Sequence, residues 1–205
     1  MLDECPSCWL SASGNLHRGR AKGVALMRPP PWLADALHAV VDAAGGSMPR
    51  LFATARLGGS VALALAPRTI VVATDELNEL TTAIWRLHTR PITISTPPAH
   101  IVAYNAWKLE VTQAILAHEL GHIRSFEAGD YTGGPAAEAA ADEFAGRVFA
   151  RLAARTTAAE RLFHLIGCRT LVCSHPRPHE RRDAFRRGQH AETVMMVYEG
   201  FAVGY

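Results

Sequence analysis

No apolar run in this sequence is long enough to cross a membrane. The longest runs cover residues 61–66, 70–73 and 114–117, whereas a spanning helix needs roughly 18 apolar residues. The first ten residues, MLDECPSCWL, carry acidic side chains where a secretory signal carries positive charge, and no apolar segment follows them. These absences disfavour a membrane span and an export signal, and they predict a soluble, cytoplasmic protein.

The chain also lacks a strong excess of either charge, and it has no internal repeat or low-complexity tract. Its net charge is +2, which gives no indication of a nucleic-acid partner. Arginines near the C-terminus hold most of the surplus, and we interpret them as a solvated helix face in preference to a phosphate or acidic-partner site: Arg177, Arg181, Arg182, Arg186 and Arg187. With 205 residues, 49% of them apolar, the chain suits one globular domain over residues 21–205, preceded by a tail over residues 1–20.

Only four cysteines occur, in two close pairs, Cys5 with Cys8 and Cys168 with Cys173. In a reducing compartment a C-x-x-C pair more often marks metal or redox chemistry than a structural disulfide. Cys5 and Cys8 are similar to one knuckle of a zinc ribbon, and the second pair would complete a four-thiolate site. Because the second pair is spaced more loosely than a knuckle, a structural zinc, free thiols and disulfides are all open interpretations.

Hydrophobic periodicity predicts a mostly helical chain with one small sheet. Apolar residues recur at helical spacing over residues 31–44, 75–89, 105–124, 135–155, 158–166 and 178–187. Short apolar and β-branched runs predict strands over residues 51–56, 61–66, 69–74 and 92–96. We expect the first three strands to form an antiparallel sheet, with residues 69–74 or 92–96 at the edge beside the helix over residues 105–124. The expected fold class is α+β.

The stretch AILAHELGHI, residues 114–123, contains the strongest chemical signal in the chain. On a helix, His118 and His122 stand one turn apart on the same face, so both imidazoles can bind one cation. Glu119 can then lie beside the metal as general base for a bound water, which is the logic of HExxH metallohydrolases. Gly121 is expected to leave room above the metal.

A catalytic zinc usually has three protein ligands and one open position. The metzincin extension would need glycine and histidine three and six residues after His122, where this chain has Ser125 and Ala128, so a further histidine ligand there is excluded. Glu138 and Asp142 are four residues apart and share a face of the next predicted helix. We predict that Glu138 reaches the metal and that Asp142 accepts a hydrogen bond from a ligand imidazole.

Each of these residues also has a plainer interpretation. The two histidines would then be structural residues on an ordinary amphipathic helix, and the two acids would be solvated side chains on an alanine-rich helix. The same alanines are small enough to let that helix approach the histidine helix closely. Glu127 and Asp130 are weaker ligand candidates because they lie in the loop predicted over residues 125–134.

HELGH followed by E-x-x-A-D resembles the gluzincins of the HtpX and CAAX prenyl protease family. That family also carries a C-terminal S-H-P-x-x-x-x-R element, and this chain has Ser174, His175 and Pro176 followed by Arg181. Residues 69–77, TIVVATDEL, look like the strand and helix start that precede the zinc helix in the same family. The matched stretches lie within residues 69–185.

The resemblance implies a zincin-like metallopeptidase domain in which His118, His122 and Glu138 bind zinc. Glu119 would be the base, and Asp142 would orient a ligand histidine. The resemblance also places His175 and Arg181 across the cleft, where a hydrogen-bond donor or cation stabilises the oxyanion of a tetrahedral intermediate. The chain departs from the family in two ways. Residues 84–107 are interpreted as an insertion over the cleft. The membrane helices of the family are missing, which directs the comparison to soluble relatives.

The sequence therefore predicts a zinc metalloendopeptidase that acts on peptides or proteins, without naming its substrate or its oligomeric state. One alternative is a regulatory metalloprotease of the ImmA/IrrE type, which has no need of the His175–Arg181 element. Another is a zinc-containing binding or maturation module with little turnover, in which Cys5 and Cys8 matter more than the cleft. A third has the thiolate of Cys5 or Cys8 capping the catalytic zinc as a latent switch.

Overall fold

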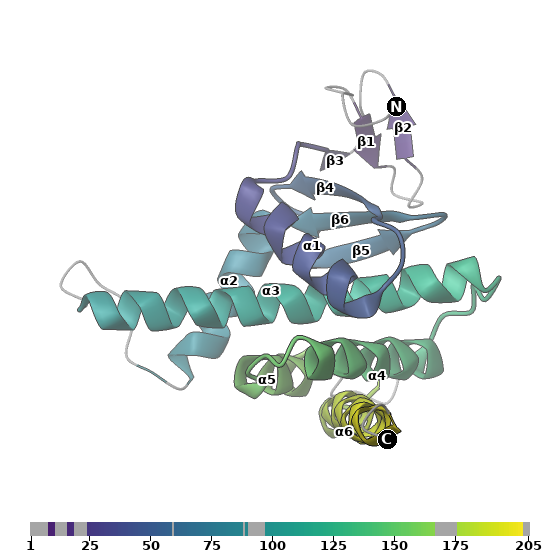
Figure 1. The fold of residues 1–205 in the computed structure, drawn as a ribbon. Coiled ribbons are helices and arrows are strands. Elements are labelled where there is room, and N and C mark those ends of the chain that lie inside the picture. Colours follow the sequence, from purple (N-terminus) through teal and green to yellow (C-terminus); the bar gives the residue numbers. More distant parts are fainter. Residues whose placement is uncertain are drawn as a thin grey trace.

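The computed structural model describes residues 8–10, 16–18, 24–58, 60–87, 89, 97–166 and 176–202. A three-stranded sheet lies on one side of a long central helix, and three further helices lie on the other side (Figure 1). The elements in chain order are β1 (Cys8–Leu10), β2 (Leu16–Arg18), β3 (Val24–Ala25), α1 (Pro31–Ala44), β4 (Arg50–Thr54), β5 (Ala62–Leu65), β6 (Thr69–Ala73), α2 (Thr74–Arg86), α3 (Pro98–Glu127), α4 (Pro135–Arg151), α5 (Thr157–Leu165) and α6 (Pro178–Ala202). The expected α+β class, mostly helical with a small sheet, is confirmed.

The main sheet has the order β4-β6-β5 and is mixed, so the prediction of an antiparallel sheet is wrong. β5 and β6 form an antiparallel pair, but β6 lies parallel to β4. All five residues of β6 are buried, and a strand without an exposed face is suited to a central place with a partner on each side. The edge strand beside α3 is consequently β5, whereas the expected strand over residues 92–96 lies outside the described residues.

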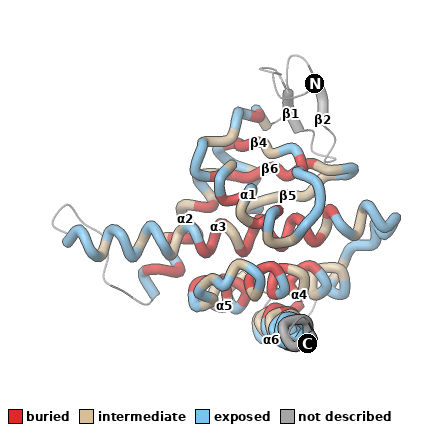
Figure 2. Tube along the Cα trace, viewed as in Figure 1, coloured by how far each residue is buried: buried red, intermediate tan, exposed pale blue. Residues whose placement is uncertain are grey.

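Several helices differ in length from their predictions, and the differences are largest for α3 and α6. The expected helix over residues 105–124 begins at Pro98 and ends at Glu127, with proline in its first turn. Its N-terminal turns are mostly exposed, whereas residues 114–121 are all buried (Figure 2). The exposed turns show no apolar periodicity for a sequence argument to detect. α6 likewise continues to Ala202 instead of ending near residue 187.

Two other predicted segments contain strands or helices. Residues 8–10 and 16–18, expected in a tail, form strands β1 and β2 of a small antiparallel sheet with β3. Residues 84–107 were expected as an insertion over the cleft; their described part completes α2 and begins α3, and the insertion stays a prediction. No helix within the described ranges has both the length and the apolar character needed to span a membrane.

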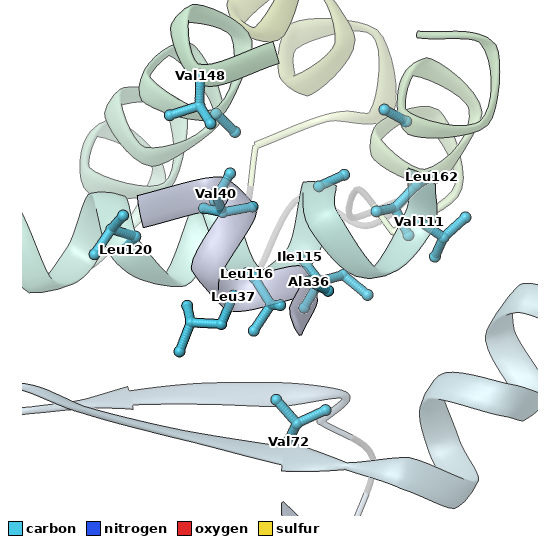
Figure 3. Close-up of a cluster of buried hydrophobic side chains, with 14 of the residues drawn as sticks. Ala36, Leu37, Val40, Val72, Val111, Ile115, Leu116, Leu120, Val148 and Leu162 are labelled. Carbon is cyan, nitrogen blue, oxygen red and sulfur yellow. The ribbon is translucent and has the colours of Figure 1, made fainter. Parts of the chain in front are cut away.

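The core surrounds the middle of α3, as the labelled side chains in Figure 3 show. The sheet and α1 cover one side of this helix, with Val72 and Leu37 among the contacts. Helices α4 and α5 cover the other side through Val148 and Leu162. A helix that is apolar nearly all round is stable only inside such a packed environment, so the two histidines on α3 are held on a rigid central element.

Candidate metal centre

His118 and His122 of α3 and Glu138 of α4 converge on one point. The Nε2 atoms of the two histidines are 3.1 Å apart. One carboxylate oxygen of Glu138 lies 3.4 Å from Nε2 of His118, and the other lies 3.4 Å from Nε2 of His122. Tetrahedral zinc with ligand bonds of about 2.0–2.1 Å places its ligand atoms about 3.3–3.4 Å from one another. The three residues therefore could hold a metal ion with one coordination position open.

Local structure explains why these side chains meet. The spacing of four residues on α3 places the two imidazoles one turn apart, with ring centroids separated by 4.7 Å. Glu138 lies in the first turn of α4, which begins after Gly134 at a φ of 89° and has Pro135 in its first position. The turn of the chain between α3 and α4 thus brings the carboxylate to the histidines.

Gly121 determines how closely α3 and α4 approach. A Cβ atom on Gly121 would lie 2.9 Å from the Cα atom of Ala141 on α4. The expectation that Gly121 leaves room above the metal is therefore wrong, because the neighbouring backbone fills that space. The expectation that small alanines allow the two helices to pack closely is confirmed by the same contact.

Asp142 connects the group of His118, His122 and Glu138, called the metal group below, to a buried arginine. Its Oδ1 atom accepts a hydrogen bond from Nδ1 of His118 at 2.8 Å, as predicted. Its two oxygens also accept hydrogen bonds from Nε and Nη2 of Arg181, each at 2.7 Å. Asp142 is 0% exposed and Arg181 is 2% exposed, so this bidentate pair is shielded from water and holds the ring of His118 in place.

Neighbouring opposite charges shift the pKa values of His118 and Glu138. Burial alone lowers the pKa of His118, but the hydrogen bonds and charges of Asp142 and Glu138 outweigh burial and raise this pKa to about 9. Burial raises the pKa of Glu138, but its contacts with His118 and His122 and the charge of Arg181 outweigh burial, so the pKa lies well below its usual range. Without a metal, the protein therefore holds an ionised Glu138 against a cationic His118.

Glu119 lies beside the metal group without belonging to it. Its side chain lines the same cleft and is 8% exposed. Burial raises the pKa of Glu119, against the nearby charges of His118 and His122, and a hydrogen bond from the backbone of Ala64 lowers it. That backbone group belongs to the edge strand β5, so the sheet contributes a contact to the candidate base. No signal in the sequence indicated this contact.

The cleft has a volume of about 590 Å³ and follows α3 from Ile115 to Phe126. β5 and the residues before it form one long wall. Leu80 of α2, Phe163 of α5 and Ile166, which follows α5, also line the cleft. Tyr131, Thr132 and Gly133 of the loop between α3 and α4 line it beside Phe126. This is enough space for several residues of an extended peptide.

The remaining predicted residues are placed as follows. His175, Cys5, Cys168 and Cys173 lie outside the described residues, so their roles stay predictions. Cys8 begins β1.

The weaker ligand candidates have other partners: Glu127 forms an ion pair with Arg68, and Asp130 accepts hydrogen bonds from Thr132. In the arginine cluster near the C-terminus, Arg186 pairs with Glu160 at the surface, which fits a solvated helix face. Arg181 is buried and does not fit that interpretation.

Comparisons with models of known families, with curated protein sequences and with solved structures found no match.

Proposed function

We propose that this protein is a zinc-dependent metalloendopeptidase with a zincin-like fold, related to the HtpX and CAAX prenyl protease family. The triangle formed by His118, His122 and Glu138 carries the proposal, because its edges and its donor atoms suit tetrahedral zinc with an open position. When bound, zinc would supply a Lewis acid that lowers the pKa of water and polarises a carbonyl oxygen.

Glu119 is the general base in this proposal. It follows His118 on the same helix, faces the cleft and is not one of the converging ligands. Because burial raises its pKa, the carboxylate is a stronger proton acceptor than an exposed one. It takes the proton of the attacking water and later gives it to the leaving amine.

Arg181 acts as a positioning residue, since two of its nitrogen atoms donate to Asp142. This assignment differs from the role at the oxyanion that the resemblance implied. In our proposal the oxyanion is stabilised by His175, as the resemblance implied, while Arg181 and Asp142 orient the imidazole of His118.

The edge strand supports a peptide as substrate. β5 pairs with β6 on one side only, and its residues line the cleft. The carbonyl of Val61 accepts a hydrogen bond from the N–H of Ala73 at 2.8 Å. Because backbone groups alternate along an antiparallel pair, those of Ala62 and Ala64 face the cleft. The N–H of Ala64 donates to Glu119, so an extended peptide can form main-chain hydrogen bonds with both groups of Ala62 and with the carbonyl of Ala64.

The proposal is tested by stripping the protein with a chelator, reloading it with zinc and exposing it to a peptide library with mass-spectrometric detection. We expect cleavage only after reloading. Glu119→Gln should keep the zinc and lose turnover, whereas Glu127→Gln, an equivalent change on the same helix outside the cleft, should behave like the parent. Full activity of Glu119→Gln would exclude the proposed mechanism.

The rival functions give different results in the same assay. Zinc binding without cleavage of any peptide would favour a binding or maturation module. Loss of cleavage in His175→Ala with the metal retained favours the proposed family over the ImmA/IrrE type. Elemental analysis measures the number of zinc ions per chain, and a second zinc would support a site at Cys5, Cys8, Cys168 and Cys173.

A further inference from the structure

Phe126 and Tyr131 form a stacked aromatic pair at one end of the cleft. Their ring centroids are 5.6 Å apart and their planes differ by 10°. Phe126 lies on α3 one turn after His122, and both aromatic residues line the cleft. Tyr131 is 67% exposed, so one face of its ring is packed while much of the residue remains open to water. An exposed aromatic ring inside a cleft is suited to receive another apolar group.

The loop that carries Tyr131 is held in position by its own hydrogen bonds. Oδ1 of Asp130 accepts one from the backbone N–H of Thr132 at 2.9 Å and one from its hydroxyl at 2.6 Å. The backbone N–H of Asp130 donates to the carbonyl of Ser125 at the end of α3, at 2.9 Å. The ring on the residue between Asp130 and Thr132 is therefore placed before any ligand binds, which lowers the entropic cost of binding.

The cleft has few charged side chains, and they cluster around His118. Among the described residues that line it, the charged side chains are those of the metal group, Glu119 and Arg181. Glu138 and Arg181 each lie within 4 Å of a charged partner in that group. An apolar substrate side chain beside Tyr131 would bury part of its surface against two rings. The neighbouring carboxylate of Asp130 is outside the cleft lining, and its Oδ1 atom is already used by Thr132.

We propose that Phe126 and Tyr131 form a subsite for an aromatic or other large apolar side chain of the peptide substrate. This inference rests on the proposed function of the metal centre. Four residues of helix separate His122 from Phe126, which corresponds to about 6 Å. An extended peptide advances about 3.3 Å per residue. The subsite therefore holds a side chain about two residues from the bond that is cut.

The test measures binding, so that it does not depend on turnover. A zinc-loaded Glu119→Gln protein is titrated with fluorescent, end-capped peptides on an alanine scaffold, in which each position in turn carries Leu, Phe, Tyr, Lys or Glu. We expect one position at which Phe and Tyr bind about tenfold more tightly than Ala, corresponding to about 1.4 kcal/mol. Lys and Glu at that position should bind no better than Ala.

Variants in the same background assign the preference to the aromatic pair. Tyr131→Ala should reduce the preference for Phe at that position to about twofold or less, and Tyr131→Phe should keep it because the ring remains. Tyr198 is 69% exposed on α6 and does not line the cleft, so Tyr198→Ala is the matched control and should keep the preference. Thermal unfolding of each variant checks that the fold is intact.

Three outcomes would overturn the subsite: an unchanged aromatic preference in Tyr131→Ala, no aromatic preference at any position, or no peptide binding by the parent protein. Failure of the proposed function gives a different result. The zinc-loaded protein with Glu119 intact would then cleave no peptide, while the binding series would still show whether Tyr131 prefers an aromatic side chain.

Discussion

Arg181 donates from Nε and Nη2 to the two carboxylate oxygens of Asp142, with both distances at 2.7 Å. The two residues come from the first turn of α6 and the middle of α4. Their pairing links the C-terminal helix to the candidate metal centre, because Asp142 also accepts the hydrogen bond from His118.

Replacing Arg181 with lysine should weaken both the fold and the metal site. Lysine cannot reproduce the bidentate geometry, and a buried carboxylate without its full partner costs roughly 3–5 kcal/mol in stability. Zinc affinity should fall by about 10–100-fold, as for other residues that orient a ligand. Urea unfolding and chelator competition measure the two effects. Arg187→Lys, at an exposed position, is the control, and equal behaviour of the two variants would contradict the role of Arg181.

The metal-free protein should lose stability as pH rises from 6.5 to above 9. The pKa of His118 is raised to about 9 in the folded protein from an unfolded value of 6.5. The protonated form is thus favoured by folding, and its contribution, about 3 kcal/mol, is fully present below pH 6.5 and disappears as pH passes through 9. Urea unfolding in chelator at several pH values measures it.

A histidine substitution provides the control for this pH effect. His118→Gln should remove the dependence over this range, and His164→Gln, at an exposed position on α5, should keep it. Zinc should show the opposite trend: its affinity should increase with pH, because the imidazoles bind metal in their neutral form. A zinc affinity that is independent of pH would contradict the ligand set.

Proline at position 64 should impair the base without breaking the sheet. Because the N–H of Ala64 faces Glu119 and not β6, proline there removes no hydrogen bond of the ladder, and edge strands tolerate it. We expect kcat to fall by about tenfold or more with zinc retained. The acid limb of the rate profile should move to higher pH, since a contact that lowers the pKa of Glu119 is lost.

Ala62→Pro is the matched comparison. The N–H of Ala62 also faces the cleft, whereas the contact with Glu119 comes from Ala64. It should raise KM more than it lowers kcat, since it removes a main-chain donor for the peptide. The same change in both parameters for the two variants would argue against a specific role of Ala64.

Glu110 on α3 should stabilise the first turn of α5. Its Oε1 atom accepts hydrogen bonds from the backbone N–H groups of Ala158 at 2.6 Å and Ala159 at 3.0 Å, in the first turn of α5. Glu110→Ala leaves both donors without this acceptor and should cost about 1–3 kcal/mol. Glu110→Gln keeps an acceptor oxygen and should cost less. Glu143→Ala, which breaks a more exposed pair with Arg147, should cost under about 1 kcal/mol in the same urea titration.

Patterns over short distances were predictable from the chain itself. The spacing of His118 and His122 needs only the geometry of one helix, and Glu138 follows at the start of the next helix, so the three residues that converge could be named in advance. The extent of α1 was predicted for the same reason, since periodicity and the flanking proline and glycine define it locally.

Contacts between distant segments were decided by the tertiary structure. Whether Arg181 faces solvent or Asp142, whether β6 is central or at an edge, and whether Gly121 faces a cavity or Ala141 all depend on how elements pack. Residue types and spacing determined which atoms could bind a metal. Only packing decided which groups orient them, because hydrogen bonds between elements depend on the positions of whole helices and strands.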